Sequence, residues 1–185
     1  MRTGGPGESA LLLLDVVDLL NVQKITYAVI GALAASVHGA VRASLDADAL
    51  ISIPLSQATQ LQGAAKASGF SADLSRGDLD DPISGVLKLG DSWDNRVDLL
   101  IGLRGMDSQA FDRVVDVPFE GQNLRFIGRE DFIAMKVFAG GPLDLVDAAR
   151  ALAAGGTSLD RPLLRRLAGK FGREASAALE KLLTE

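Results

Sequence analysis

Residues 44–53 alternate between apolar and polar side chains, and this pattern restricts the folds open to the chain. The apolar members share one face of the pattern, namely Leu45, Ala47, Ala49, Ile51 and Ile53. Asp46 and Asp48 fall on the other face. The alternation predicts a strand over Ser44–Ile53 with one buried side, on which residues two apart lie about 7 Å apart at their backbones. Two carboxylates so placed repel each other and need a compensating charge, most often a divalent cation.

A third carboxylate belongs to a second predicted strand. Asp98 lies in the otherwise apolar segment Arg96–Ile101. If this strand pairs beside the first, three aspartates come together, and such a set can hold two Mg²⁺ ions roughly 3.5–4 Å apart. Two ions in that arrangement would bind the attacking and leaving oxygens of a phosphoryl or nucleotidyl transfer.

Gly31 stands between a predicted strand, Ile25–Ile30, and a predicted short helix, Ala32–His38. Because glycine has no Cβ, it permits a tight turn from strand to helix. The backbone N–H groups at the start of a helix favour a phosphate. Gly31 is therefore a candidate for contact with the phosphates of a nucleotide.

The composition excludes several other kinds of site. The chain of 185 residues has no cysteine and one histidine, His38. Disulfides, a cysteine nucleophile, an iron–sulfur cluster and a structural zinc site are therefore ruled out. Asp and Glu number 24 against 19 Lys and Arg, a formal net charge of -5. Any metal is expected to be a hard cation with oxygen ligands, and the acidity argues against wholesale nucleic-acid binding.

No apolar run predicts a membrane segment. The stretch Ala10–Leu14 is interrupted by Asp15 and is too short for a signal peptide or a membrane helix. We expect a soluble cytoplasmic protein with no membrane partner.

The order of predicted elements indicates an α/β (α+β) fold with a helical extension. The α/β core would span residues 1–128, beginning with a glycine-rich flexible lead-in over 1–8, and residues 129–185 would be a helical segment packed on it. Further expected core elements are helices over Ser9–Val22 and Leu55–Ser68, a loop over Asp73–Ser84, a strand over Gly85–Leu89 and one or two short strands within 111–127. The expected C-terminal helices are Arg129–Ala139, Leu143–Ala154, Arg161–Phe171 and Arg173–Leu183.

The order of glycine, Asp-x-Asp and a third aspartate resembles the nucleotidyltransferase superfamily, which has the DNA polymerase β-like fold. Its members carry Gly-Ser or Gly-Gly, then Asp-x-Asp, then an Asp on a following strand; here these are Gly31-Ala32, Asp46/Asp48 and Asp98. A narrower resemblance is to small prokaryotic members related to the AbiEii-type toxins. It rests on Tyr27-Ala-Val-Ile-Gly-Ala-Leu-Ala-Ala, His38-Gly, Arg42-Ala-Ser-Leu-Asp46-Ala-Asp48, Phe132-Ile-Ala-Met-Lys136 and Pro142-Leu-Asp144-Leu-Val-Asp147.

The resemblance implies a nucleotidyltransferase fold, with a mixed β-sheet flanked by helices. It also implies Mg²⁺-dependent transfer of a nucleoside monophosphate from a nucleoside triphosphate to an acceptor hydroxyl of tRNA or another RNA, a protein or a small molecule. Asp46 and Asp48 would be catalytic metal ligands, and Asp98 a further ligand or the base that activates the acceptor. Gly31, Ala32 and Lys136 would bind the nucleotide.

Four further features have a structural alternative beside the functional one. Arg42 could bind a nucleotide phosphate or form an ion pair. His38 could act as a base that contacts substrate, or close a short helix. Asp144 could contact substrate or, with Asp147, favour the helix start and hold Lys136 in place. A basic stripe could receive RNA phosphates or be the solvated face of a helix; it comprises Arg161, Arg165, Arg166, Lys170 and Arg173.

Two departures from the family pattern bear on a second hypothesis. Ala32 replaces the Ser or Gly expected after Gly31, and Asp144 follows Leu143, where the relatives usually have a basic residue. Ala32 favours a catalytically silent binding or regulatory protein of the same fold, a toxin–antitoxin component with a cognate antitoxin or a second copy as its partner. The intact set of three aspartates opposes this hypothesis, because like charges without a use are costly to keep together.

Overall fold

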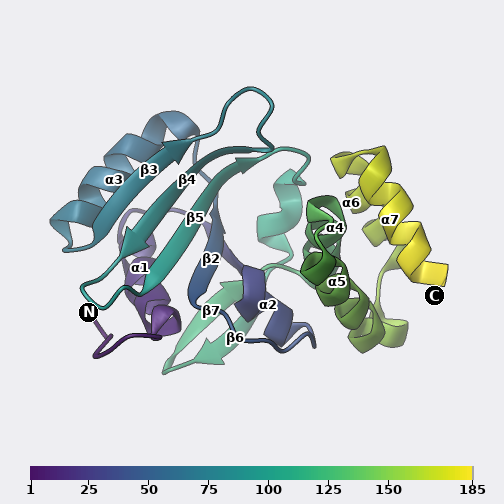
Figure 1. The fold of residues 1–185 in the computed structure, drawn as a ribbon, viewed down its shortest axis with the longest axis horizontal. Helices are drawn as coiled ribbons and strands as arrows, with labels where there is room; N and C mark the ends of the chain where they lie inside the picture. The colour runs from purple at the N-terminus through teal and green to yellow at the C-terminus, as the bar shows by residue number, and fades with distance from the viewer. Residues whose placement is uncertain (185) are drawn as a thin grey trace.

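The computed structural model describes residues 1–184 as a seven-stranded mixed sheet with helices packed around it (Figure 1). In the order β3-β4-β5-β2-β1-β7-β6, the sheet contains β1 (Tyr27–Ile30), β2 (Asp46–Ile51), β3 (Ser71–Arg76), β4 (Ile83–Gly90), β5 (Arg96–Leu103), β6 (Val115–Phe119) and β7 (Gln122–Phe126). The α-helices are α1 (Ser9–Val22), α2 (Gly31–Val37), α3 (Ala58–Ala67), α4 (Arg129–Ala139), α5 (Pro142–Gly155), α6 (Arg161–Phe171) and α7 (Arg173–Thr184). Short 3-10 helices are η1 (Leu55–Gln57), η2 (Ser108–Asp112) and η3 (Gly156–Ser158). The predicted α/β fold class is confirmed.

Strand β2 lies in the middle of the sheet, antiparallel to β1 and parallel to β5. Helix α1 packs against β2 and β5, whose side chains Val97, Leu99 and Ile101 are fully buried. Helix α3 packs against β3 and β4. Because successive side chains of a strand point to opposite faces, the polar residues of β2 and β5 lie on the face turned away from this core.

Helices α4 to α7 pack on one another beside the sheet, at the right of Figure 1. Helix α4 contacts each of the other three and buries Phe132, Ile133 and Val137. It ends at Gly140, whose φ of +67° is a backbone conformation that glycine adopts readily. The four helices predicted from residue 129 onward are confirmed. Among residues 1–184, no helix has the length and apolar character needed to cross a membrane.

Strand β3 lies where the sequence predicted a loop. We expected the segment Asp73–Ser84 to be an irregular loop. Its first residues belong to β3 and its last residues belong to β4. Strand β3 is at the edge of the sheet, and none of its side chains is fully buried. It therefore lacks the apolar alternation that identifies a half-buried strand, and the predicted loop was wrong at both of its ends.

Residues 1–8 contain no helix or strand but are attached to the rest of the fold. Arg2 forms ion pairs with Asp15 at 2.8 Å and with Asp18 at 2.7 Å. The backbone N–H of Glu8 donates to the side-chain oxygen of Asn95 at 2.6 Å. These contacts attach the segment to α1 and to the turn before β5, and its flexibility stays a prediction.

Asp107 connects helix α6 to the loop that follows β5. Its buried carboxylate lies 2.6 Å from the Lys170 ammonium and 2.9 Å from the Arg166 guanidinium. The hydrogen bond from Lys170, ahead of the other partners, holds the pKa of Asp107 well below its usual range. Arg165 pairs with Glu180 of α7 at 2.7 Å. Three of the five cations in the basic stripe are thus engaged within the protein, which weakens the RNA-binding alternative.

Replacing Asp107 with asparagine is expected to lower the free energy of unfolding by about 2 kcal/mol at pH 7, because two cations lose their anionic partner. A carboxylate whose pKa is lowered by folding stabilises the folded protein fully at pH values above the pKa that it has in the unfolded chain, which is near 4. This stabilisation is lost as the pH falls below that value. In urea unfolding, the free energy of unfolding of the wild type should therefore exceed that of Asp107→Asn at pH 7, and the difference should become smaller below pH 4. Asp116→Asn, at an exposed position of β6, is the control. Equal stability of wild type and Asp107→Asn at pH 7 would contradict this account.

Candidate active site

The three predicted aspartates lie on one face of the sheet. Strands β2 and β5 pair in parallel with Asp48 opposite Asp98 and Asp46 opposite Arg96. Residues in register point to the same face, as do residues two apart on one strand. Lys88 of β4 is the next residue in the row, opposite Asp98. The predicted pairing of the two strands is confirmed, and Lys88 and Arg96 border the carboxylates.

The aspartates disfavour one another's ionised forms. Burial, followed by the charges of Asp98 and Asp46, raises the pKa of Asp48 to about 6, against the opposite effect of Lys136 and Arg42. Burial also raises the pKa of Asp98. A raised carboxyl pKa means that the surroundings of the group supply less stabilisation to its negative charge than water does. The cluster is therefore short of positive charge.

The donor set fits a hard divalent cation in its chemistry. Carboxylate oxygens are the ligands that Mg²⁺ prefers, and a cation would relieve the repulsion among Asp46, Asp48 and Asp98. In their present positions, no three Asp, Glu or His side chains within residues 1–184 form a group that could hold a metal ion. Residues two apart on a strand are separated by about 7 Å, so these side chains must turn toward one another to share an ion. Binding of two Mg²⁺ ions stays a prediction.

Gly31 lies directly against the Asp48 carboxylate, at the junction of β1 and α2. Its φ is +64°, and a Cβ at this position would overlap the carboxylate oxygen of Asp48. Strand β1 places Ile30 opposite Asp48 in the antiparallel pair, which brings the turn to this edge of the cluster. Position 31 therefore requires glycine for two reasons, the backbone conformation and the space that Asp48 occupies.

Two cations reach the site and form ion pairs with aspartates of α5. Lys136 comes from α4, and Arg42 comes from the loop before β2. The Lys136 ammonium lies 2.7 Å from Asp144 and 3.0 Å from Asp147. The Asp147 carboxylate also accepts a hydrogen bond of 3.2 Å from Arg42. Asp147 is 1% exposed and Lys136 is 9% exposed, whereas the side chains of Arg42 and Asp144 are 30% and 31% exposed, so the network has a buried centre and an outer part in contact with water. Arg42 and Asp144 thus form ion pairs within the protein, and their contact with a nucleotide or substrate stays a prediction.

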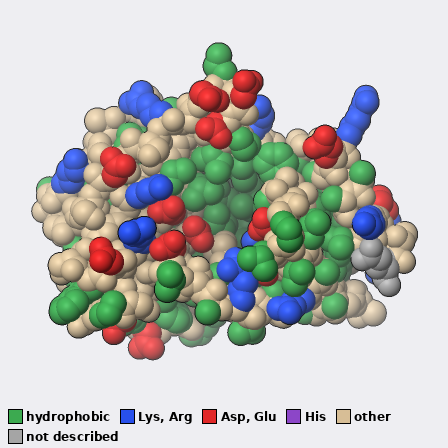
Figure 2. Space-filling model, in the orientation of Figure 1, with side chains coloured by type: hydrophobic (Ala, Val, Ile, Leu, Met, Phe, Trp, Pro, Cys, Tyr) green, Lys and Arg blue, Asp and Glu red, His purple; other side chains and the backbone are tan. Residues whose placement is uncertain are grey.

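These residues line one pocket of about 270 Å³. Four charged residues and one glycine line part of it, namely Arg42, Asp48, Lys136, Asp144 and Gly31. The rest of the lining is apolar and consists of Ile30, Leu100, Phe132, Met135 and Ala139. Figure 2 shows acidic side chains gathered beside a hollow with an apolar floor, between the sheet and the C-terminal helices. The structure thus brings five of the predicted site residues to one pocket, with Asp46 and Asp98 beside Asp48 on the same face of the sheet.

His38 and the Ala32 side chain are not brought to this pocket. His38 is 3% exposed, and its Nε2–H donates to the carbonyl oxygen of Ile127 at 2.7 Å. Burial lowers the pKa of His38, and its ring packs on Phe132 with centroids 5.3 Å apart. The predicted substrate contact of His38 therefore has no support from its position. Ala32 is buried in α2, so only its backbone remains available for a nucleotide.

The apolar side of the pocket was missed by sequence reasoning. Leu100 follows Asp98 by two residues on β5, and Met135 precedes Lys136 on α4. Apolar residues in a strand or helix are ordinarily assigned to the core, so nothing in their pattern distinguished them. Lys88 had a usable signal, because it is a lone cation within the predicted strand Gly85–Leu89.

Comparison with known proteins identifies the fold. No protein-family model matches the chain, and no curated protein matches it in sequence. The solution structure of the antibiotic-resistance factor ANT(2'')-Ia matches with a TM-score of 0.60 and 16% identity, covering 94% of this chain and 96% of that one. The crystal structure of ANT(2'')-Ia in complex with adenylyl-2''-tobramycin matches with a TM-score of 0.58 and 14% identity over 87% and 95% of the two chains.

A third solved structure extends the likeness. An antigenic nucleotidyltransferase-like protein from Paracoccidioides brasiliensis matches with a TM-score of 0.59 and 14% identity, over 98% of this chain and 90% of that one. At such identities the likeness establishes the fold alone. The chain has the nucleotidyltransferase fold, as the sequence resemblance implied.

Proposed function

We propose that this protein is an Mg²⁺-dependent nucleotidyltransferase, which moves a nucleoside monophosphate from a nucleoside triphosphate to an acceptor hydroxyl. The observation that carries the proposal is the placement of Asp48, which lies in register with Asp98 and directly against Gly31. This placement occurs beside a buried lysine, in the fold of nucleotidyltransferases. Carboxylate ligands for a cation, an adjoining pocket and nearby positive charge are together what a phosphate-transfer site requires.

Each residue then has a defined role. Asp46 and Asp48, with Asp98 beside them, would hold Mg²⁺, which supplies positive charge to the phosphate oxygens and orients them for displacement. Gly31 lets the turn between β1 and α2 lie directly against the Asp48 carboxylate, so that a phosphate bound to the same cation would lie beside the backbone of this turn. Lys136 donates to phosphate oxygens, in exchange for part of its bonding to Asp144. Asp147 is a positioning residue, since it holds Lys136 and Arg42 in place from a buried position.

One side of the aspartate cluster on the open face is apolar, whereas Lys88 and Arg96 border the other side. Leu50, Leu100 and Val86 are in register with one another in the next row of the open face. Phosphates of a nucleic acid require cations, whereas this row offers apolar contact. A small hydroxyl compound with an apolar face is therefore the acceptor that we favour over RNA or protein. The complex of ANT(2'')-Ia with adenylyl-2''-tobramycin supports a small-molecule acceptor on this fold.

Nucleotide binding is the first test of the proposal. Mg²⁺ with the correct nucleoside triphosphate, at about tenfold above its Kd, is expected to raise the melting temperature by about 3–5 °C. Asp46→Asn should abolish this shift. Asp80→Asn is a matched control, because Asp80 belongs to a second Asp-x-Asp pair, Asp78/Asp80, in an exposed loop. If neither Mg²⁺ nor any of the four common nucleotides shifts the melting temperature, the proposal fails.

The catalytically silent protein is the second candidate, and Ala32 favours it. It predicts Mg²⁺–nucleotide binding without transfer to any acceptor. The narrower resemblance to AbiEii-type toxins, and with it a cognate antitoxin, stays a prediction. Co-expression with the product of an adjacent gene, and recovery of a complex of both chains, would test that partner.

A further inference from the structure

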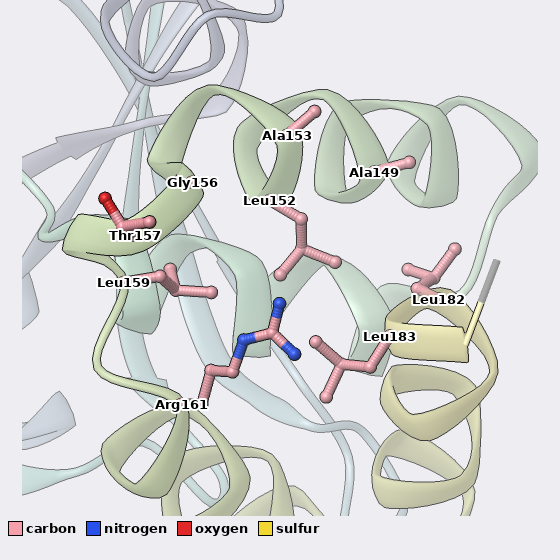
Figure 3. Close-up of a pocket in the computed structure, with 9 residues that line it drawn as sticks. All are labelled: Ala149, Leu152, Ala153, Gly156, Thr157, Leu159, Arg161, Leu182 and Leu183. Atoms are coloured by element: carbon pink, nitrogen blue, oxygen red, sulfur yellow. The ribbon is translucent and has the colours of Figure 1, made fainter.

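A second cavity, of about 700 Å³, lies among the C-terminal helices (Figure 3). It is formed by α5, η3, the start of α6 and the end of α7. Its lining residues are Ala149, Leu152, Ala153, Gly156, Thr157, Leu159, Arg161, Leu182 and Leu183. Most of these are aliphatic, and none is acidic. Ala149, Ala153, Gly156, Thr157 and Arg161 are exposed and the leucines are half-buried, so this cavity is a groove open to solvent, and its volume is in the range of small-molecule sites.

Arg161 supplies the charge in the cavity. Figure 3 shows its guanidinium pointing into the space between Leu152 and Leu183. Within the chain as far as Thr184, Arg161 forms no ion pair, although Arg165, Arg166 and Lys170 of the same helix all do. Arg161 is exposed, and its guanidinium presents donors to a space whose described lining contains no carboxylate.

The cavity is separate from the candidate active site. Helix α5 turns Asp144 and Asp147 toward Lys136, whereas it turns Ala149, Leu152 and Ala153 into the cavity. Residues at positions i, i+3 and i+4 share one side of a helix, so the two sets use different sides of α5. No step of the proposed transfer uses Arg161 or the leucines around it.

We propose that this cavity binds an apolar molecule carrying a single carboxylate, with the carboxylate on Arg161 and the apolar body against Leu152, Leu182 and Leu183. A guanidinium presents paired N–H donors that match the two oxygens of a carboxylate. Burial of the apolar body against the leucines adds the hydrophobic contribution that a short polar anion lacks. The cavity thus distinguishes an amphipathic acid both from an inorganic anion and from a neutral lipid.

Calorimetric titration of the full chain with dodecanoate, kept below its micelle concentration, tests this site. We expect saturable binding of one dodecanoate for each chain. Dodecan-1-ol, which has the apolar body without the charge, should bind at least about tenfold more weakly. Arg161→Gln should weaken dodecanoate binding by about tenfold or more, whereas Arg173→Gln, which removes an equal charge at an exposed position outside the cavity, should leave it within about twofold.

A second variant tests the cavity without touching the charge. Ala153→Trp, at an exposed helix position on the cavity wall, should obstruct part of the space and weaken dodecanoate binding by about tenfold while the melting temperature stays close to that of the wild type. Absence of saturable dodecanoate binding would overturn the proposal. Equal binding of dodecanoate by wild type and Arg161→Gln, or equal binding of dodecan-1-ol and dodecanoate, would overturn it as well.

Discussion

Asp48→Asn is expected to raise the free energy of unfolding by about 2 kcal/mol at pH 7.5. Burial and two neighbouring carboxylates raise the pKa of Asp48 to about 6 in the folded protein, from an ordinary value near 4. At pH 7.5 the group is ionised in surroundings that disfavour its charge, and this costs stability. Asparagine has nearly the same shape without the charge, so the cost is removed.

The pH dependence fixes the sign of this effect. A carboxyl group whose pKa is higher in the folded state binds protons more tightly there, so its contribution to stability falls as the pH rises from about 4 through 6. The advantage of Asp48→Asn should therefore be full above pH 7 and less than about a third of that value at pH 4. Urea unfolding at both pH values, with Asp80→Asn as the control, measures it. A variant less stable than wild type at pH 7.5 would show that the Asp48 charge is already compensated.

Gly31→Ala is expected to have the opposite effect, a loss of about 3 kcal/mol in unfolding free energy. Alanine in the left-handed region costs about 1 kcal/mol, and its Cβ would overlap the Asp48 carboxylate, which adds a packing cost of about 2 kcal/mol. Gly121→Ala separates the two terms, because Gly121 also has a positive φ, +82°, but has no atom within 4 Å of a Cβ. This control should lose about 1 kcal/mol only.

A double-mutant cycle identifies the clash. In an Asp48→Ala background the two closest atoms, the carboxylate oxygen and carbon, are absent while the Cβ at 3.0 Å remains, so Gly31→Ala should cost less than in the wild type but more than the Gly121→Ala control. Urea unfolding of the four proteins gives the coupling free energy directly. An equal cost of Gly31→Ala with and without the Asp48 carboxylate would mean that the two residues are not in the close contact described above.

The sequence was sufficient for the two strands at the centre of the site, whereas their pairing side by side was only a possibility until the structure showed it. The alternation around Asp46 and Asp48 and the apolar segment around Asp98 are strong local signals, and each follows from burial of one strand face. The edge strand β3 had no such signal, because its side chains are exposed or half-buried. His38 illustrates a different limit, since a lone histidine reads equally well as a base or as a core residue until its partner, Ile127, is known.

The charge network of the site could not be predicted in the same way. Arg42 and Asp147 are 105 residues apart in the chain, and their contact depends on how α5 packs beside the sheet. The sequence suggested Lys136 and the two aspartates of α5 as a set, but not that Asp147 serves Lys136 and Arg42 together. Apolar residues such as Leu100 and Met135 become recognisable as pocket walls only when the helices are placed.

Transfer of label from α-³²P nucleoside triphosphates, with Mg²⁺, tests the proposed function most directly. The acceptors are pools of RNA, protein and small molecules from one cell extract, and the comparison is wild type against Asp48→Asn. We predict Mg²⁺-dependent labelling of the small-molecule pool by wild type, reduced by about 10³-fold in Asp48→Asn. Because that variant is expected to be the more stable protein, its loss of activity cannot be ascribed to unfolding. Absence of label from all three pools, or equal labelling by both proteins, would contradict the assignment of Asp48 to a nucleotidyl-transfer site.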